Sequence, residues 1–391
     1  MSSNMETEVD ILLIEFGTLV LGLALIARAA RWLGLPVLPV YLLAGLAFGK
    51  GGIVDLGASS DFIEVGAEIG LILMLLTLGL EFSAHELIDN VRKSASAGIV
   101  DLVLNFPPGF VAGLLLGFDP IVAVLLGGVT YISSSGIVSK LVADLDRVQN
   151  RETPVVLSVL VIEDLAMVLY LPVVTAVLFG DSASTTVITV VISLAAVTAI
   201  LTVEYFYGDR INSLILSNSR EVLLLTLLGA TLAIAGLAER IHLSAAVGAF
   251  LVGVVLSGEV VSHARDLLLP LRHLFAASFF VFFGLQVDPG IIPDVALLAA
   301  ALAVLTAVTK VGTGWFAARS KKLDTSERFR AGSALIARGE FSIVIAELGV
   351  GREPDLGALS AAYVILLAVT GGLLYHFDNA LPRIARRWSR R

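Results

Sequence analysis

The sequence predicts an all-α polytopic membrane protein with thirteen transmembrane helices, of which helices 1–6 and 8–13 form an inverted repeat. Three observations predict this fold: the apolar composition, the placement of the basic residues and a faint internal repetition. The 391 residues are 57% hydrophobic and 15% charged, whereas soluble chains average about 45–50% apolar and about 25% charged residues. No long polar stretch interrupts the apolar runs, so we expect one transmembrane domain over residues 1–391.

The apolar runs have the length that a bilayer requires, because a membrane-spanning helix needs about 20 mostly apolar residues. Thirteen segments qualify, of which the second, ninth and tenth are short. The predicted spans are 11–33, 36–48, 62–82, 94–116, 121–142, 154–179, 186–206, 221–237, 243–256, 274–287, 293–316, 329–348 and 359–379.

The basic residues support this count. With the N-terminus outside, only Lys50, Arg240 and Arg352 fall in outside loops, while Lys310 and Arg338 fall within spans. The other 21 of the 26 Lys and Arg residues then lie on the inside, as cytoplasmic loops require. The sequence therefore predicts a multi-pass protein of the cell (plasma) membrane with an outside N-terminus and a cytoplasmic C-terminus.

A weak internal repeat relates the two halves of the chain. "TLGLEF" (77–82) closes the third span and "FFGLQV" (282–287) closes the tenth, at an offset of 205 residues. The same offset places the serine run 133–135 on residues 338–340. With 186–206 as a linker helix, the second half runs in the opposite direction. Inverted repeats are common in secondary transporters, whose substrate sites lie near the bilayer midplane between the repeats.

A run of small and polar residues, "GGVTYISSSGIVSKL" (127–141), interrupts the fifth span. Serines compete for backbone hydrogen bonds and weaken a helix locally. Unwound backbone at membrane depth is tolerated where it lines a cavity or is buried in protein. The hydroxyl and carbonyl groups of Thr130, Ser133 and Ser134 are then candidate ligands for a small cation. Close helix packing through small residues is the alternative interpretation.

Two adjacent acids, Glu163 and Asp164, lie in the middle of the sixth span. A charge at the centre of a membrane helix costs about 2.5–3.5 kcal/mol on insertion scales. Adjacent helical residues point about 100° apart, so one acid can face a partner helix and the other a cavity. Lys310 either neutralises one of these acids or extends toward the cytoplasmic interface. We expect the other acid to hold a proton or a metal cation in competition.

Four further polar residues are candidates for the protein core. Asp101 and Asn105 are separated by four residues and share one face of the fourth span, so they can line the same cavity. Arg338 and Glu340 flank a glycine in the twelfth span. The last two can also lie in a cytoplasmic vestibule, paired with each other or with loops.

The sequence excludes several classes of protein. It contains no HExxH zinc motif, no phosphate-binding GxxxxGK[ST] run and no Gly-x-Gly-Asp setting of an intramembrane aspartyl protease. Cysteine is absent, which excludes thiolate metal sites. We therefore expect no enzyme, no cofactor and no nucleic acid partner. A cation channel or uptake pore is the alternative to a transporter, although the chain lacks a TVGYG-type filter.

Several motifs together resemble the second family of monovalent cation:proton antiporters, which includes the Kef-type potassium-efflux systems and bacterial sodium/proton exchangers. They include "YLLAGLAFGKGGI", "ISSSGIVSKLV", "VIEDLAMVLYLPVV" and "ARGEFSIVIA", in the family's order. The resemblance implies a homodimer in membrane lipid, with a dimerisation scaffold (11–82 and 221–287) and an ion-translocating core (94–179 and 293–379). It also implies that the fifth and twelfth helices are broken and cross.

The resemblance also suggests roles for individual residues. The family's ion-binding aspartate maps onto Asp164, and the lysine of its electrogenic members maps onto Lys310. Glu163 occupies a position where the family has Gln, Asp or Asn. We expect no C-terminal regulatory domain of the Kef type in this chain, and a separate cytoplasmic regulatory subunit is compatible with the sequence. The sequence thus predicts an antiporter that exchanges H⁺ for K⁺ or Na⁺, without distinguishing the two cations.

Overall fold

The structure, a computed structural model, consists of helices joined by turns and irregular segments, with no strand, in the part of the chain that it describes. It describes residues 17–18, 20–33, 37–48, 60–80, 84–178, 183–215, 219–240, 245–256, 259–319 and 321–377. A first helix ends at residue 32, and the later helices are α2 (Val37–Phe48), α3 (Ser60–Gly79), α4 (Ala84–Leu115), α5 (Pro120–Tyr131), α6 (Ser135–Asp144), α7 (Thr153–Leu178), α8 (Ala183–Ile215), α9 (Arg220–Arg240), α10 (Ala245–Val255), α11 (Glu259–Gln286), α12 (Ile292–Arg319), α13 (Thr325–Ala334), α14 (Glu340–Val350) and α15 (Pro354–Phe377). The predicted all-α class is confirmed.

The helices present apolar side chains on their outer faces, as a lipid environment requires. Val103 on α4 and Leu297 on α12 are 62% and 82% exposed. Within the described ranges, seven segments are long and apolar enough to cross a membrane. The chain is therefore polytopic, while the count of thirteen spans remains a prediction.

Two helices are longer than their apolar segments. The tenth span was predicted over 274–287, but α11 begins at Glu259, and α8 extends the predicted 186–206 to Ala183–Ile215. The additional N-terminal part of α11 includes His263 and Arg265. Hydropathy assigns these residues to a loop, although they belong to the helix. The ends of several predicted ranges, among them 11–16 and 378–379, lie outside the described residues.

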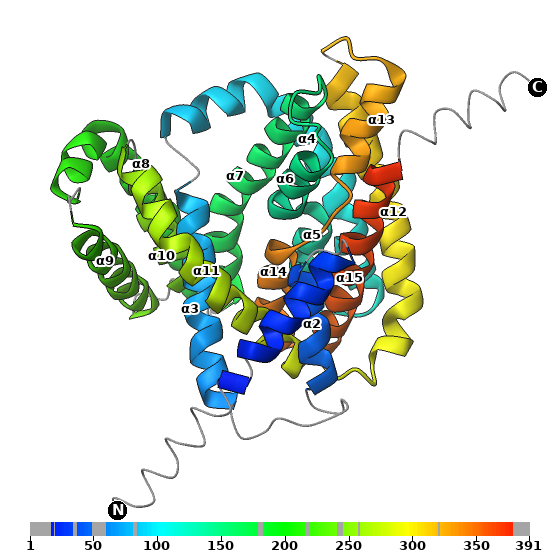
Figure 1. Ribbon diagram of the computed structural model, residues 1–391, viewed down its shortest axis with the longest axis horizontal. Helices are drawn as coiled ribbons and strands as arrows, with labels where there is room; N and C mark the ends of the chain where they lie inside the picture. The colour runs from blue at the N-terminus through cyan, green and yellow to red at the C-terminus, as the bar shows by residue number, and fades with distance from the viewer. Residues whose placement is uncertain are drawn as a thin grey trace, which may run out of the picture.

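The helices form two groups (Figure 1). In the first, which we call the α11 group, α11 packs on α2 and α3, and α10 packs on α3 and α9. In the second, the α12 group, α4 packs on α5 and α7, while α12 packs on α4, α13 and α15. The groups meet mainly where α10 contacts α7 and α15 contacts α2, and α8 contacts both α7 and α10. Each group is thus packed more extensively within itself than against the other.

Glycines bring the helices of the α11 group into backbone contact. A Cβ added to Gly79 of α3 would lie 2.8 Å from the Gly253 Cα of α10. A Cβ added to Gly45 of α2 would likewise lie 2.8 Å from the Gly284 Cα of α11. Small residues are the usual means by which membrane helices approach this closely. Both contacts therefore exclude any larger side chain without a shift of the helices.

Two helices of the α12 group are interrupted at the places where they cross. Residues 132–134 separate α5 from α6, and residues 335–339 separate α13 from α14. The interruptions bind each other, because the Ser134 N–H donates to the Ala337 carbonyl at 2.9 Å. The Ser342 hydroxyl donates to the Val129 carbonyl at 3.0 Å. The break expected from the serine run is thus present, and a second break crosses it.

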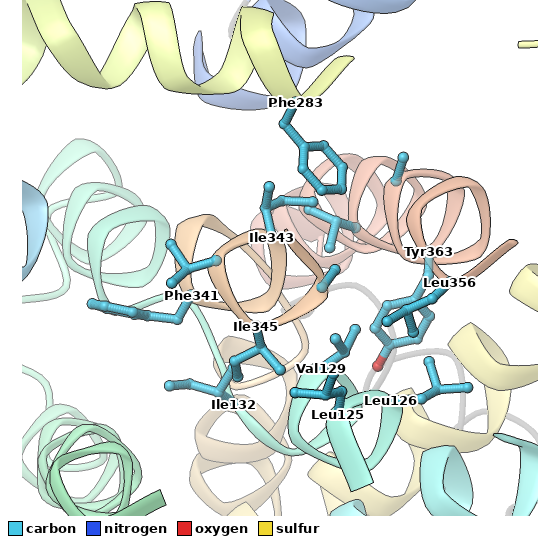
Figure 2. Packing of buried hydrophobic residues seen from close by; sticks show 14 of the residues in the cluster. Leu125, Leu126, Val129, Ile132, Phe283, Phe341, Ile343, Ile345, Leu356 and Tyr363 are labelled. Atoms are coloured by element: carbon cyan, nitrogen blue, oxygen red, sulfur yellow. The ribbon is translucent and has the colours of Figure 1, made fainter. Parts of the chain in front are cut away.

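Apolar side chains surround the crossing (Figure 2). Val129 and Ile132 at the end of α5 lie beside Ile345 of α14, and Tyr363 of α15 approaches from the other side. Phe283 of α11 reaches over α14 from the other helix group. The polar backbone of the two breaks is therefore enclosed in an apolar core, which makes its hydrogen bonds obligatory.

Candidate functional site

The adjacent acids of α7 lie at the crossing of the two interrupted helices. Glu163 is 0% exposed and Asp164 is 3% exposed. Glu163 accepts hydrogen bonds from the Ser133 N–H and, at 3.1 Å, from the Ser133 hydroxyl. The same hydroxyl lies 2.9 Å from the Leu335 carbonyl in the second break. The first acid is therefore fixed to both interruptions.

Lys310 of α12 joins two carboxylates. Its Nζ lies 2.8 Å from Glu163 Oε1, so the ion pair that the sequence predicts is present. Nζ also lies 2.8 Å from Asp101 Oδ1 and 3.0 Å from Asp101 Oδ2. The Tyr131 ring lies below the ammonium, with its centroid 5.4 Å from Nζ. The Lys310 ammonium is therefore paired inside the protein. It does not extend to the cytoplasmic interface, so the alternative interpretation is wrong.

Asp164 is held at the start of α6. The Ser135 hydroxyl donates to Asp164 Oδ2 at 2.9 Å. Ser135 is the first residue of α6, where the partial positive charge of a helix N-terminus favours an anion. Ser135 is half-buried and Gly136 is exposed, so the start of α6 reaches the molecular surface.

The hydroxyl groups predicted as cation ligands are only partly where the sequence placed them. The Thr130 hydroxyl donates to the Asn105 carbonyl at 2.9 Å and also contacts the Gly127 carbonyl. The Ser134 hydroxyl accepts from the Ile137 N–H at 3.2 Å and lies 3.5 Å from Glu340. Both groups therefore connect helices, whereas Ser135, which the prediction omitted, contacts Asp164.

Asp101 and Asn105 line one polar seam between α4 and α12. The Asn105 amide donates to Asp101 Oδ1 at 2.9 Å and to the Thr313 hydroxyl at 3.1 Å. Its Oδ1 accepts from the Thr309 hydroxyl at 2.7 Å. The shared face inferred from their spacing is present, and it faces Lys310. The sequence did not identify Asp101 as a partner of this lysine.

Arg338 is fully buried and binds backbone carbonyls of both interrupted helices. Its guanidinium donates to the Thr130 carbonyl of α5 and to the carbonyls of Leu335 and Ile336 in the second break. Its Nε contacts the Tyr363 hydroxyl at 3.2 Å. The carbonyls at helix C-termini carry partial negative charge, which the guanidinium offsets. Arg338 is thus a core residue, as one of the two interpretations expected, and the alternative location in a vestibule is wrong.

Glu340 does not pair with Arg338 in the described structure. Its Oε1 lies 3.5 Å from an Nη of Arg272, which belongs to α11, and its side chain is 4% exposed. The alternative in which Arg338 and Glu340 pair with each other is therefore wrong. Because Arg272 and Glu340 come from different groups, this ion pair links the α11 group to the α12 group.

The site resembles a transport site more closely than a catalytic or resident-metal site. Across the described residues, no group of three or more histidines and acids is arranged to hold a metal ion. Oxygen ligands around one carboxylate suit a hard monovalent cation that binds and leaves again.

Comparison with known proteins agrees with this geometry. The chain aligns over 96% of its length with a solved structure of the sodium proton antiporter MjNhaP1 from Methanocaldococcus jannaschii, covering 98% of that chain. The TM-score is 0.71 at 17% sequence identity, which shows a shared fold.

Curated relatives are closer in sequence. The chain is 33% identical over 389 residues to the K(+)/H(+) antiporter subunit KhtU of Bacillus subtilis (strain 168), covering 97% of this chain and 96% of that protein. It is 30% identical over 392 residues to the ammonium/H(+) antiporter subunit AmhT of Alkalihalophilus pseudofirmus, covering 96% and 95%. The family model described as "Sodium/hydrogen exchanger, transmembrane" matches residues 19–376. The chain therefore belongs to the sodium/hydrogen exchanger family and is a monovalent cation:proton antiporter, not an enzyme.

Proposed function

We propose that the protein exchanges H⁺ for K⁺ or Na⁺ by alternating access, and that Asp164 is the shared binding group. The observation that carries this proposal is the position of Asp164 at the crossing of two interrupted helices, beside a hydroxyl donor and a helix N-terminus. A carboxylate there can be neutralised by a proton or by a cation, and the two compete for it.

The relatives support this assignment. The two curated relatives are named as a K⁺/H⁺ antiporter subunit and an ammonium/H⁺ antiporter subunit. The solved structure is that of a sodium proton antiporter. A channel is not favoured, because the family consists of exchangers. We further propose Glu163 and Lys310 as a supporting pair and Ser133 as the contact that fixes Glu163. Thr130 and Ser134 support the crossing rather than the ion.

The proposal is tested with purified protein in proteoliposomes that contain a pH-sensitive dye. Addition of K⁺ or Na⁺ on one side should move protons to that side, with no steady channel-like current. A cation-dependent current without proton movement would identify a pore and contradict the proposal. Using Na⁺, K⁺ and Li⁺ in turn identifies the transported cation.

The structure also supports the proposed division into an inverted repeat with scaffold and core. The Gly79–Gly253 contact joins α3 to α10, and the Gly284–Gly45 contact joins α11 to α2. If α3 corresponds to α11 and α2 to α10, the two contacts are symmetry equivalents. We propose that the α11 group is the scaffold that dimerises and that the α12 group is the core that moves. The N-terminus would lie outside and the C-terminus in the cytoplasm.

The scaffold contacts give a stability prediction. Gly284→Ala places a Cβ 2.5 Å from the Leu42 carbonyl oxygen and 2.8 Å from the Gly45 Cα, and overpacking of this kind costs about 1–3 kcal/mol. We expect a lower melting temperature in detergent. Gly229→Ala is the matched control, because a Cβ there meets nothing within 4 Å. Equal melting temperatures for the two variants would show that the contact is not tight.

Ser135 gives a prediction about cation affinity. Ser135→Ala removes the hydroxyl that contacts Asp164 but leaves the carboxylate in place. We expect the cation concentration for half-maximal flux to rise about tenfold, since a hydrogen bond to a charged group contributes about 1.5–3 kcal/mol. Ser158→Ala is the control, because its hydroxyl only contacts the Pro154 carbonyl one turn earlier in α7. An unchanged half-maximal concentration would remove Ser135 from the site.

The names of the curated relatives also bear on partners. Both KhtU and AmhT are named as antiporter subunits. We propose that this chain forms a homodimer in membrane lipid and works with a separate cytoplasmic regulatory subunit. Copurification from native membranes tests this: a second polypeptide in constant ratio supports it, and a homodimer alone contradicts the regulatory subunit.

A further inference from the structure

We propose that the turn after α12 is a binding surface for the headgroup of an anionic phospholipid. The surface, which we call the basic turn, consists of a tryptophan and four basic residues: Trp315, Arg319, Lys321, Lys322 and Arg328. It lies at one end of α12, away from the contacts of the candidate ion site. The proposal concerns a partner of the protein and does not depend on the role of Asp164.

The outer face of α12 presents apolar side chains where lipid chains would lie. Leu297, Val304 and Val308 are 82%, 66% and 64% exposed, and α12 runs along the edge of the molecule (Figure 1). Trp315 shares their face, because residues seven or four positions apart lie on one side of a helix. Arg319 follows four residues after Trp315. The stripe that contacts lipid chains therefore ends at the first residue of the basic turn that carries a charge.

The length of α12 places its ends among the lipid headgroups. Its 28 residues span about 42 Å at about 1.5 Å per residue. The hydrocarbon layer of a bilayer is about 30 Å thick, and the bilayer with its headgroups is about 40–45 Å thick. Trp315 and Phe316, which are 37% and 43% exposed, lie one turn before Arg319, at the level where membrane proteins carry aromatic residues. The basic residues after them then lie at the level of the phosphates.

The backbone after α12 folds back on the end of the helix and holds the basic residues close together. The Lys321 N–H donates to the Ala318 carbonyl at 3.2 Å. The Lys322 N–H donates to the Arg319 carbonyl at 3.1 Å. Leu323 is 3% exposed and fixes the end of the turn in the core, while the two lysines and Arg319 are exposed. Charges on an ordered backbone lose less freedom on binding than charges on a flexible tail.

Arg328 adds a fourth positive charge from the first part of α13. Its Nε donates to the Leu323 carbonyl at 2.8 Å. Its guanidinium carbon lies 5.8 Å from the centroid of the Trp315 ring, a distance at which a cation and an aromatic ring attract each other. With Nε bound to a carbonyl, the terminal Nη groups are those that can bind a phosphate, for which the planar guanidinium is well suited.

Acidic side chains do not neutralise the basic turn in the part of the chain that the structure describes. Two neighbouring arginines are paired with acids: Arg330 with Glu152, and Arg151 with Glu327. Among the described residues, no ion pair involves the basic turn. The Asp324 side chain caps α13 by accepting from the Glu327 N–H at 2.8 Å. Residues 315–330 contain five basic and two acidic residues, a net charge of +3.

The position beside the lipid-facing stripe favours a phospholipid over other anions. Basic residues are common in cytoplasmic loops, but here they lack acidic partners and adjoin an exposed tryptophan. Clusters of four to eight Lys and Arg residues directly beside a membrane helix are typical of sites for anionic headgroups. A free phosphate or an acidic protein would contact the charges alone. A phospholipid would contact both parts, with its phosphate at the basic turn and its chains along α12.

The test uses the fluorescence of Trp315 in liposomes. The chain has three tryptophans, so Trp32→Phe and Trp388→Phe leave Trp315 as the only reporter. Bromine atoms on lipid chains quench tryptophan only at short range. All liposomes contain the same small mole fraction of phosphatidylglycerol in phosphatidylcholine, and the same amount of bromine is placed on one lipid or on the other. We expect quenching that corresponds to about fivefold enrichment of phosphatidylglycerol, the factor for attraction by about one basic residue. Equal quenching by the two lipids would overturn the proposal.

A charge-removing variant with a matched control assigns the enrichment to the basic turn. The triple variant R319Q/K321Q/K322Q should quench equally with the two brominated lipids. The control R28Q/R210Q/R220Q removes three exposed arginines from the first helix, α8 and α9, and should keep the enrichment. Enrichment that persists in the triple variant, or that disappears in the control, would overturn the proposal. If the triple variant does not fold, K321Q/K322Q decides in the same assay, with at least a twofold loss of enrichment expected and an unchanged value contradicting the proposal.

Two further measurements identify the ligand. Raising the salt concentration should reduce the enrichment, because ions screen exposed charges; a value independent of salt would contradict an electrostatic site. Inorganic phosphate, added at constant ionic strength, should leave the enrichment unchanged. A reduction by phosphate would identify a site for the free anion and overturn the assignment to a lipid. None of these readouts uses proton flux, so different results refute the lipid surface and the proposed exchange.

Discussion

Asp164→Asn abolishes cation-dependent proton flux, which falls to that of vesicles without protein. The amide has the shape of the acid and can keep the contact with Ser135, but it cannot exchange a proton for a cation. We expect no second carboxylate to replace it, because Asp101 and Glu163 are both bound to Lys310. The measurement is the dye response of proteoliposomes to a cation pulse.

An Asp→Asn substitution at an exposed position is the matched control. It shows whether flux is lost because the binding group is removed or because any aspartate is removed. Asp294 lies in the first turn of α12 and is exposed. Asp294→Asn should retain cation-dependent proton flux. It should lower helix stability by about 0.3–1 kcal/mol, because it removes a negative charge that interacts favourably with the helix macrodipole. Flux that persists in Asp164→Asn, with protein correctly folded by size-exclusion chromatography, would refute the assignment of Asp164.

Arg338→Met is expected to lower stability by at least about 2 kcal/mol. Methionine fills much of the volume but leaves the carbonyls of Thr130 and Ile336 without their guanidinium donor, while the Leu335 carbonyl keeps the Ser133 hydroxyl. Each buried acceptor that loses its partner costs about 1–3 kcal/mol. We expect a lower melting temperature in detergent and less protein in the membrane fraction.

Two variants calibrate this result. Arg338→Lys keeps the charge but replaces five rigidly arranged donors by three on a compact ammonium, so it should be intermediate. Arg240→Met removes an exposed arginine from the last turn of α9 and should change the melting temperature little. Wild-type stability in Arg338→Met would mean that the two interruptions do not depend on the guanidinium.

The class of fold could be predicted from the sequence because apolar runs of bilayer length leave few alternatives. Hydropathy failed where a helix continues with charged residues, as α11 does from Glu259. The break at 132–134 had a local signal in its three serines. The break at 335–339 had a weaker local signal in a single glycine, because its carbonyl groups are bound by Arg338 within the break and by the serines of the first break.

The sequence predicted which residues carry charge in the candidate site, but it predicted less well which residues contact one another. Buried adjacent acids in an apolar helix require a counter-charge, so the contact between Lys310 and Glu163 followed. Asp101 was recognised as a core residue, but its spacing from Asn105 gives only their shared face, not the lysine opposite. Ser135, the first residue of α6, contacts Asp164, whereas Thr130, near the end of α5, contacts the Asn105 carbonyl. Residue type does not reveal this difference, because it depends on where α5 ends and α6 begins.

The hydrogen bonds between the two interruptions have a mechanical consequence. Ser134 is bound to Ala337, and Ser342 is bound to Val129, so neither half-helix can slide without carrying the other. Under alternating access, the two interrupted helices would move together as a rigid body. The barrier to this motion would arise at the contact with the α11 group. Bilayer thickness and viscosity should then set the turnover rate while leaving the affinity for the ion unaltered.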